Sequence, residues 1–278
     1  MLNFEKMLVA SSLFLIHLSG CATSGITRTS RFKIDRDIVY KTVDGISLSG
    51  DLYQPLLPGA KPAVVVVHGG GWSSRGGRMT QVAEDLAGSG FVVFNVTYRL
   101  APESLYPKAV EDIRDAVHFT ESQAQRLEID PARISIWGYS AGAHLALMVG
   151  LNPNNHLKSI VAGGTPADFL AWPHSPIVRK FLGFTLEERP DLWRDASPVN
   201  HVLAGSPPVF LYHGETDQIV EVEQMNKMKA ALEKKNVPVE THRVAGLGHI
   251  PVYLFSEESI ALGLQFIQRK MPPPVQTP

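Results

Sequence analysis

The fold of this 278-residue chain is indicated most clearly by nine residues near its middle, Ile134-Ser135-Ile136-Trp137-Gly138-Tyr139-Ser140-Ala141-Gly142. An apolar run, predicted as a strand, leads into a serine that stands between two glycines, and a helical pattern follows. Such a turn is so sharp that side chains at Gly138 and Gly142 would collide with their surroundings, and it pushes the serine out above the sheet edge. Ser140 is therefore a candidate nucleophile. The alternative is a glycine-rich loop with a capping serine, which the rest of the chain must decide.

Strand and helix patterns alternate on both sides of this turn. Solid apolar runs of the kind buried on both faces of a parallel sheet lie at residues 63–67, 91–96, 134–137, 159–162 and 209–212, with a last strand at 239–244. Helical patterns lie at residues 78–88, 105–122, 141–150, 221–235 and 256–269. A β-hairpin is expected at residues 38–48, around Asp44-Gly45. The alternation predicts one α/β domain over residues 36–270, with a mainly parallel, doubly wound sheet and helices on both faces.

Composition places the chain among ordinary globular proteins. It is 44% apolar and 19% charged, with a net charge of −1. No run of lysine and arginine predicts nucleic-acid binding. The histidines do not cluster with cysteine or aspartate as transition-metal ligands do, and no phosphate-binding glycine loop is present. We therefore expect no metal, no cofactor and no nucleic-acid partner.

The N-terminus has a different character. Residues 7–18 form an apolar run that is too short to span a bilayer as a mature helix and is typical of a secretory signal. The following Leu18-Ser19-Gly20-Cys21 resembles the lipobox of bacterial lipoproteins, in which the cysteine is diacylated and becomes the mature N-terminus. The resemblance implies a signal peptide over residues 1–20 and a lipid anchor on Cys21 in a bacterial cell envelope. The alternative is an ordinary cleaved signal with an incidental cysteine.

Two terminal segments are expected to lie outside the folded domain. Residues 21–35 are rich in serine and threonine and are predicted to be a tether between the lipid and the domain. Residues 271–278 contain four prolines and are predicted to be a disordered tail.

Segments with reactive side chains follow the ends of four predicted strands, where ligands bind in open α/β sheets. In chain order they are His68-Gly69-Gly70-Gly71-Trp72, the serine turn, His213-Gly214-Glu215-Thr216-Asp217, and Gly246-Leu247-Gly248-His249. Four such placements are far rarer by chance than one. They remove the capping-loop alternative for the serine.

These segments resemble the α/β-hydrolase fold and, within it, the carboxylesterase and lipase group with an HGGG oxyanion motif, which includes hormone-sensitive-lipase-like and feruloyl-esterase-like enzymes. The resemblance covers residues 36–270 and includes residues 98–103, a segment that supports the nucleophile turn in the family. It implies that Ser140 is the nucleophile, Asp217 the acid and His249 the base of a carboxylic ester hydrolase.

Elementary chemistry agrees with these roles. A serine hydroxyl needs a neighbouring imidazole to accept its proton, and a carboxylate behind the imidazole fixes the tautomer. The tetrahedral intermediate needs hydrogen-bond donors for its oxyanion. The backbone N–H groups of Gly70, Gly71 and Ala141 are the candidates, since glycine allows close approach of the backbone and Ala141 begins the helix after the nucleophile.

Several nearby residues could compete for these roles. Glu215 lies in the same turn as the proposed acid, and Glu221 is expected to open the next helix. His213 is expected to bond backbone as a structural loop residue. His68 is expected to support the glycine loop, and His144 to pack in the core.

Specificity is expected to depend on a small lid at residues 165–200. Its aromatic side chains could line an apolar pocket or could pack a small subdomain: Phe169, Trp172, Phe181, Phe184 and Trp193. Trp72 could likewise line the substrate pocket or simply pack. Without a large cap the site should be open and should suit short-acyl or aryl esters. A serine peptidase or amidase of the same fold, and a non-catalytic binding protein, stay open as alternatives.

Overall fold

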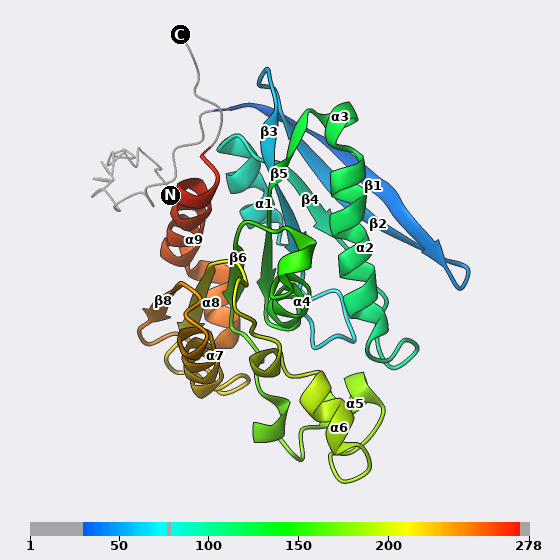
Figure 1. Cartoon of the computed structure of the whole chain (residues 1–278), viewed down its shortest axis with the longest axis vertical. Helices are drawn as coiled ribbons and strands as arrows, with labels where there is room; N and C mark the ends of the chain where they lie inside the picture. The colour runs from blue at the N-terminus through cyan, green and yellow to red at the C-terminus, as the bar shows by residue number, and fades with distance from the viewer. Residues whose placement is uncertain (1–29, 77–78, 273–278) are drawn as a thin grey trace, which may run out of the picture.

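The computed structural model describes residues 30–76 and 79–272, whose strands form one eight-stranded sheet in the order β1-β2-β4-β3-β5-β6-β7-β8 (Figure 1). The strands are β1 Phe32–Val43, β2 Ile46–Pro55, β3 Lys61–Val67, β4 Val92–Val96, β5 Ile129–Tyr139, β6 Ile160–Gly163, β7 Val209–Gly214 and β8 Val239–Val244. Neighbouring strands pair in parallel from β4 to β8, whereas β2 pairs antiparallel with both β1 and β4. The predicted mainly parallel sheet is confirmed.

Helices cover both faces of this sheet. They are α1 Thr80–Gly88, α2 Lys108–Ser122, α3 Ala124–Leu127, α4 Ala141–Gly150, α7 Glu223–Lys234, α8 His249–Phe255 and α9 Glu257–Lys270. In β3, Val65 and Val67 pack into one hydrophobic cluster with residues of α2, α4 and α7, whereas Val64 and Val66 pack into a second cluster with residues of α1, α8 and α9. A strand buried on both faces needs apolar side chains at every position, which is the pattern seen in the sequence.

The segment predicted to be a lid, residues 165–200, lies between β6 and β7 and projects beyond the end of the sheet (Figure 1). It contains two short helices, α5 Pro176–Leu182 and α6 Pro190–Asp195. Four of its five named aromatic residues take one of the two predicted roles, whereas Phe184 is exposed and does not line the cavity, so it takes neither. Phe169, Phe181 and Trp193 are fully buried and pack the lid, whereas Trp172 is half-buried and lines a cavity described below.

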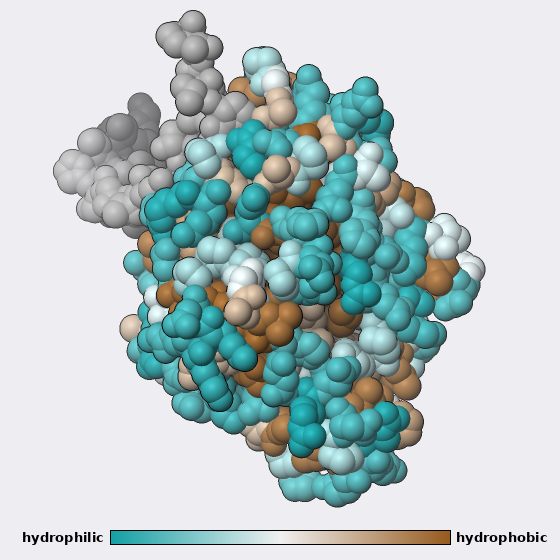
Figure 2. All heavy atoms as spheres, viewed as in Figure 1, coloured by the Kyte–Doolittle hydropathy of each residue, from teal (hydrophilic) through white to brown (hydrophobic). Residues whose placement is uncertain are grey.

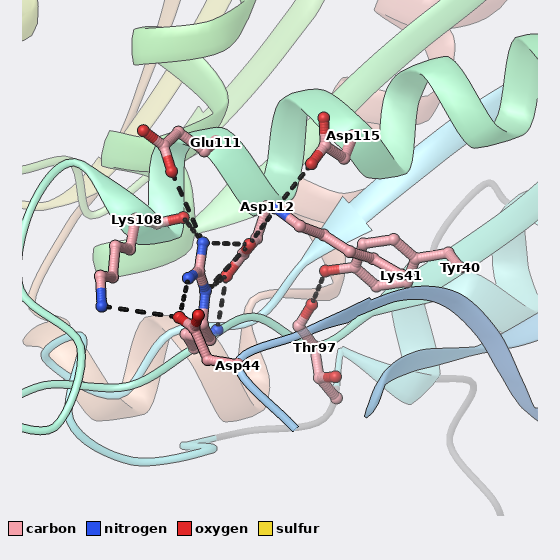
Figure 3. A network of polar contacts seen from close by, with 9 residues as sticks. Tyr40, Lys41, Asp44, Thr97, Lys108, Glu111, Asp112 and Asp115 are labelled. Carbon is pink, nitrogen blue, oxygen red and sulfur yellow. Dashed lines mark hydrogen bonds and ion pairs between the residues drawn. The ribbon is translucent and has the colours of Figure 1, made fainter. Parts of the chain in front are cut away.

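An ion-pair network ties the β1–β2 hairpin to α2 (Figure 3). The buried guanidinium of Arg99 lies 2.8 Å (Nη2 to Oδ1) from the carboxylate of Asp112, which is also buried. Lys41 of β1 reaches the same carboxylate at 2.8 Å, and Asp44 at the hairpin turn lies 3.2 Å from Arg99 Nη1. The hairpin is therefore fixed to the domain by charge as well as by strand pairing.

The folded domain is longer at both ends than predicted. β1 begins at Phe32, so residues 32–35, expected in the tether, belong to the sheet because they pair with β2. Met271 is fully buried, and Arg133 donates to the carbonyl of Pro272 at 2.8 Å, so the expected tail does not begin at residue 271. The predicted signal peptide, Cys21 and residues 273–278 lie outside the described residues.

The face shown in Figure 2 is mostly hydrophilic, with smaller apolar patches toward its middle. Within residues 30–76 and 79–272, no helix has the length and hydropathy needed to cross a bilayer.

Candidate active site

The predicted nucleophile turn has the expected geometry. Ser140 lies between the end of β5 and the start of α4, with a backbone at φ 54° and ψ −122° that non-glycine residues rarely adopt. Its amide donates to the carbonyl of Gly163 at 2.8 Å, which pins the turn to β6. A Cβ placed on Gly142 would lie 2.2 Å from the carbonyl oxygen of Val67, so only glycine lets α4 approach β3 this closely.

Ser140, His249 and Asp217 form one hydrogen-bonded chain. Ser140 Oγ lies 2.8 Å from His249 Nε2, and His249 Nδ1 lies 2.6 Å from Asp217 Oδ2. Because a carboxylate can only accept, Nδ1–H donates to Asp217, which leaves Nε2 as the acceptor for the serine hydroxyl. This is the tautomer that can take a proton from Ser140.

The surroundings of Asp217 keep it ionised. Burial alone would raise the pKa of this carboxyl, but hydrogen bonds from His213, His249 and the amide of Val220 outweigh it and hold the pKa well below its usual range. Its second oxygen accepts from the amides of Ile219 and Val220 at 2.9 and 2.8 Å. Asp217 is therefore fixed by the loop after β7 and is charged at neutral pH.

The two competing acids have surroundings that differ from those of Asp217, whereas His213 lies beside Asp217. Glu215 and Glu221 are both exposed, and Glu221 accepts a hydrogen bond from Trp172 Nε1 at 2.7 Å. His213 is buried and donates from Nε2 to the carbonyl of Val220 at 2.7 Å, which confirms the predicted backbone contact. It lies in β7 and not in the expected loop, and the same nitrogen is 3.3 Å from Asp217 Oδ2.

Two further histidines are buried and neutral. His68 donates from Nδ1 to the carbonyl of Gly69 at 2.7 Å, and burial lowers its pKa to about 4. His144 is fully buried in the core, as predicted. It donates from Nε2 to the carbonyl of Ala196 at 2.8 Å and accepts from Trp72 Nε1 at 3.2 Å, and burial lowers its pKa to about 3. His144 thus joins the glycine loop to the lid.

The glycine loop brings backbone to the nucleophile. Gly70 has φ 116°, and a Cβ on it would lie 2.2 Å from the carbonyl oxygen of Ser74. Gly70, Gly71 and Ala141 all line the same cavity as Ser140, which places the predicted oxyanion donors in its wall. Trp72 lines this cavity too, although its ring is buried and stacks on Phe181 with centroids 4.6 Å apart.

The cavity has a volume of about 800 Å³ and is mainly apolar. Sequence reasoning missed several of its walls, namely Ile177 of the lid, Ile219 after Asp217, and Ile250, Tyr253 and Leu254 of α8. Tyr253 follows His249 by four positions, so a helix predicted there would have placed these two side chains on one face. Ile250 and Leu254 are likewise four positions apart. Among the described residues, no group of three or more metal-ligating side chains could hold a metal ion.

Comparison with known proteins shows the family. The model of the BD-FAE family matches residues 51–232. This chain belongs to the BD-FAE family. The BD-FAE chain is 29% identical over 185 residues to the esterase LipC of Mycobacterium tuberculosis, a match that covers 59% of this chain and 46% of LipC. It therefore spans about half the length of that relative.

Solved structures show that this BD-FAE chain has the α/β-hydrolase fold. A truncated carbohydrate esterase from gut microbiota superposes with a TM-score of 0.78 at 20% identity, covering 87% of this chain and 97% of that one. The butyrate-bound form of esterase Est2 from Thermogutta terrifontis superposes with a TM-score of 0.74 at 23% identity, covering 89% of this chain and 97% of that one. The predicted fold class is confirmed.

Proposed function

We propose that this BD-FAE protein is a carboxylic ester hydrolase that acts through Ser140, His249 and Asp217. The observation that carries the proposal is the hydrogen-bonded chain from Ser140 Oγ through His249 to an ionised Asp217, at the wall of an apolar cavity. The esterase name of the relative LipC supports it. The hydrogen-bonded chain is the arrangement that makes a hydroxyl nucleophilic at neutral pH.

In the first half of the reaction, Ser140 Oγ attacks the ester carbonyl carbon while His249 Nε2 takes the hydroxyl proton. The carbonyl π electrons move to oxygen, and the backbone N–H groups of Gly70, Gly71 and Ala141 donate to the oxyanion. Losing one such donor typically raises the barrier by ~3 kcal/mol. As the intermediate collapses, the bond to the alcohol oxygen breaks and His249 gives its proton to the leaving alcohol, which leaves an acyl-Ser140.

The second half repeats these roles with water. His249 Nε2 takes a proton from a water molecule that attacks the acyl carbon, and the same donors hold the oxyanion. Collapse breaks the bond to Ser140 Oγ, and the proton returns to the serine. Asp217 stays ionised throughout and balances the imidazolium. The products are a carboxylic acid and an alcohol.

The substrates proposed are short-acyl or aryl esters. The cavity is mainly apolar, and the lid that borders it is small. The butyrate-bound state of the structurally similar Est2 agrees with a short acyl group.

A fluorophosphonate probe, which phosphonylates activated serines, tests the catalytic proposal. Wild-type protein should be labelled and should hydrolyse p-nitrophenyl acetate, and Ser140→Ala should lose both. Ser122→Ala, at an exposed serine on α2, is the control and should keep both. Folded wild-type protein that is neither labelled nor active would instead favour a binding protein, and turnover of peptides but not esters would favour a peptidase.

We also propose that the protein is anchored to a bacterial envelope by lipid on Cys21, on the strength of its lipobox-like sequence. Cys21→Ser should abolish incorporation of labelled palmitate and release the protein from the membrane fraction. Ser24→Ala, three positions further on, should keep both. Palmitate incorporation into Cys21→Ser protein would contradict the anchor.

A further inference from the structure

One acidic side chain lies in the wall of the active-site cavity. Glu221 belongs to the loop between β7 and α7, four positions after Asp217, and lines the cavity. If histidines are counted as neutral, it is the one formally charged side chain among the described residues that line this cavity. A substrate in the cavity therefore meets a negative charge with no lining cation to offset it.

Glu221 is paired with an aromatic ring from a distant part of the chain. Trp172, in the lid, donates from Nε1 to Glu221 Oε2 at 2.7 Å and lines the same cavity. This single hydrogen bond engages one of roughly four lone-pair sites of the carboxylate, so acceptor capacity and full negative charge remain. The half-buried indole adds a π face, and the face of tryptophan attracts cations most strongly among aromatic side chains.

We propose that Glu221 and Trp172 form a charge-selecting subsite, which favours esters with a positively charged group over neutral esters of the same shape and disfavours anionic esters. The proposal rests on the proposed ester hydrolysis at Ser140. The carboxylate attracts a cation by Coulomb interaction, and the indole face adds a cation–π contact. If Glu221 served only to hold Trp172 in the lid, a neutral amide acceptor would do equally well.

Two isosteric substrates separate these roles. Acetylcholine and 3,3-dimethylbutyl acetate share one shape and differ in whether the branched centre is a cationic nitrogen or a neutral carbon. The measured quantity is the ratio of their kcat/KM values in wild type and in Glu221→Gln, which keeps a side-chain oxygen for Trp172. Glu223→Gln, two positions further on and outside the cavity lining, is the matched control.

Wild-type protein should favour acetylcholine, and Glu221→Gln should lower the ratio by about twofold to fivefold, the range for an exposed ion pair. Glu223→Gln should keep the wild-type ratio. Raising the salt concentration from about 0.01 M to 1 M should shrink the wild-type preference, because the screening length falls from about 30 Å to 3 Å.

The subsite and the catalytic proposal fail in different ways. A ratio that Glu221→Gln leaves unchanged overturns the subsite, even if the neutral ester is hydrolysed well. Protein that the fluorophosphonate labels at Ser140 but that hydrolyses neither ester also counts against the subsite. Folded protein without labelling and without turnover overturns the proposed hydrolysis, and the subsite with it.

Discussion

At the level of single residues, the candidate site depends on which ring nitrogen of His249 carries the proton. Asp217 holds His249 Nδ1–H at 2.6 Å, which leaves Nε2 free to accept from Ser140. Asp217→Asn places an amide N–H against Nδ1 and favours the tautomer with hydrogen on Nε2, which cannot take the serine proton. We expect kcat for p-nitrophenyl acetate to fall about 10⁴-fold.

Glu215→Gln is the control for this prediction. Glu215 lies in the same loop and is exposed, so its variant should keep nearly wild-type kcat. The opposite pattern, with activity lost in Glu215→Gln and kept in Asp217→Asn, would assign the acid to Glu215.

The buried neutral His144 predicts a pH dependence of stability. Burial lowers its pKa to about 3, whereas an unfolded histidine has a pKa near 6.5. Between these values the unfolded chain binds a proton that the folded protein does not, so the free energy of unfolding falls as pH falls. One such imidazole accounts for ~2 kcal/mol between pH 7 and pH 5.

Urea unfolding of wild type and His144→Leu at the two pH values measures this contribution. The variant is expected to be less stable at pH 7, because it loses the bonds to Trp72 and Ala196, but its stability should fall less on acidification. His118→Gln, at an exposed position on α2, should keep the wild-type difference. Equal pH differences in wild type and His144→Leu would refute the assignment.

Among the elements, the attachment of the β1–β2 hairpin to α2 depends on the buried ion pair between Arg99 and Asp112. Asp112→Ala would leave Arg99, whose side chain is 3% exposed, without its main carboxylate (Figure 3). Breaking a buried pair in this way costs ~3–5 kcal/mol, which should appear as a lower urea midpoint.

The matched control is an exposed ion pair within the β1–β2 hairpin itself. Arg36 lies 2.9 Å from Asp51, and its side chain is 62% exposed. Arg36→Ala should therefore lower stability by less than ~1 kcal/mol. Equal losses of stability in Asp112→Ala and Arg36→Ala would show that the buried ion pair contributes no more to stability than an exposed one.

Prediction of the elements from sequence succeeded where the local pattern was strong. The buried strands and the long helices have clear apolar periodicity, and their predicted positions lie within a few residues of the observed ones. The short helices α3, α5, α6 and α8, of four to seven residues each, were not predicted. Helices this short are unstable alone and form because tertiary packing supports them, so their sequences carry little signal.

At the scale of the whole molecule, the small lid predicts a preference for short acyl chains. The part of an acyl chain that extends beyond the active-site cavity stays in water, so its burial contributes no binding energy. We expect kcat/KM for p-nitrophenyl acetate and butyrate to exceed that for the palmitate ester, measured below the concentration at which the palmitate ester aggregates. A profile that rises with chain length would contradict this prediction.

The α/β class and the turn at Ser140 were predictable from sequence alone, because each depends on a pattern of residues that are close together in the chain. The proposed roles of Ser140, Asp217 and His249 depend in addition on the resemblance to a family, since these residues are far apart in the chain. The tertiary structure decided what surrounds Ser140. Trp172 and Glu221 are 49 positions apart, and only the packing of the lid against the loop after β7 brings them together. The walls contributed by α8 likewise depend on a helix that forms through packing. Contacts between distant segments depend on how the elements pack, and local periodicity does not encode that packing.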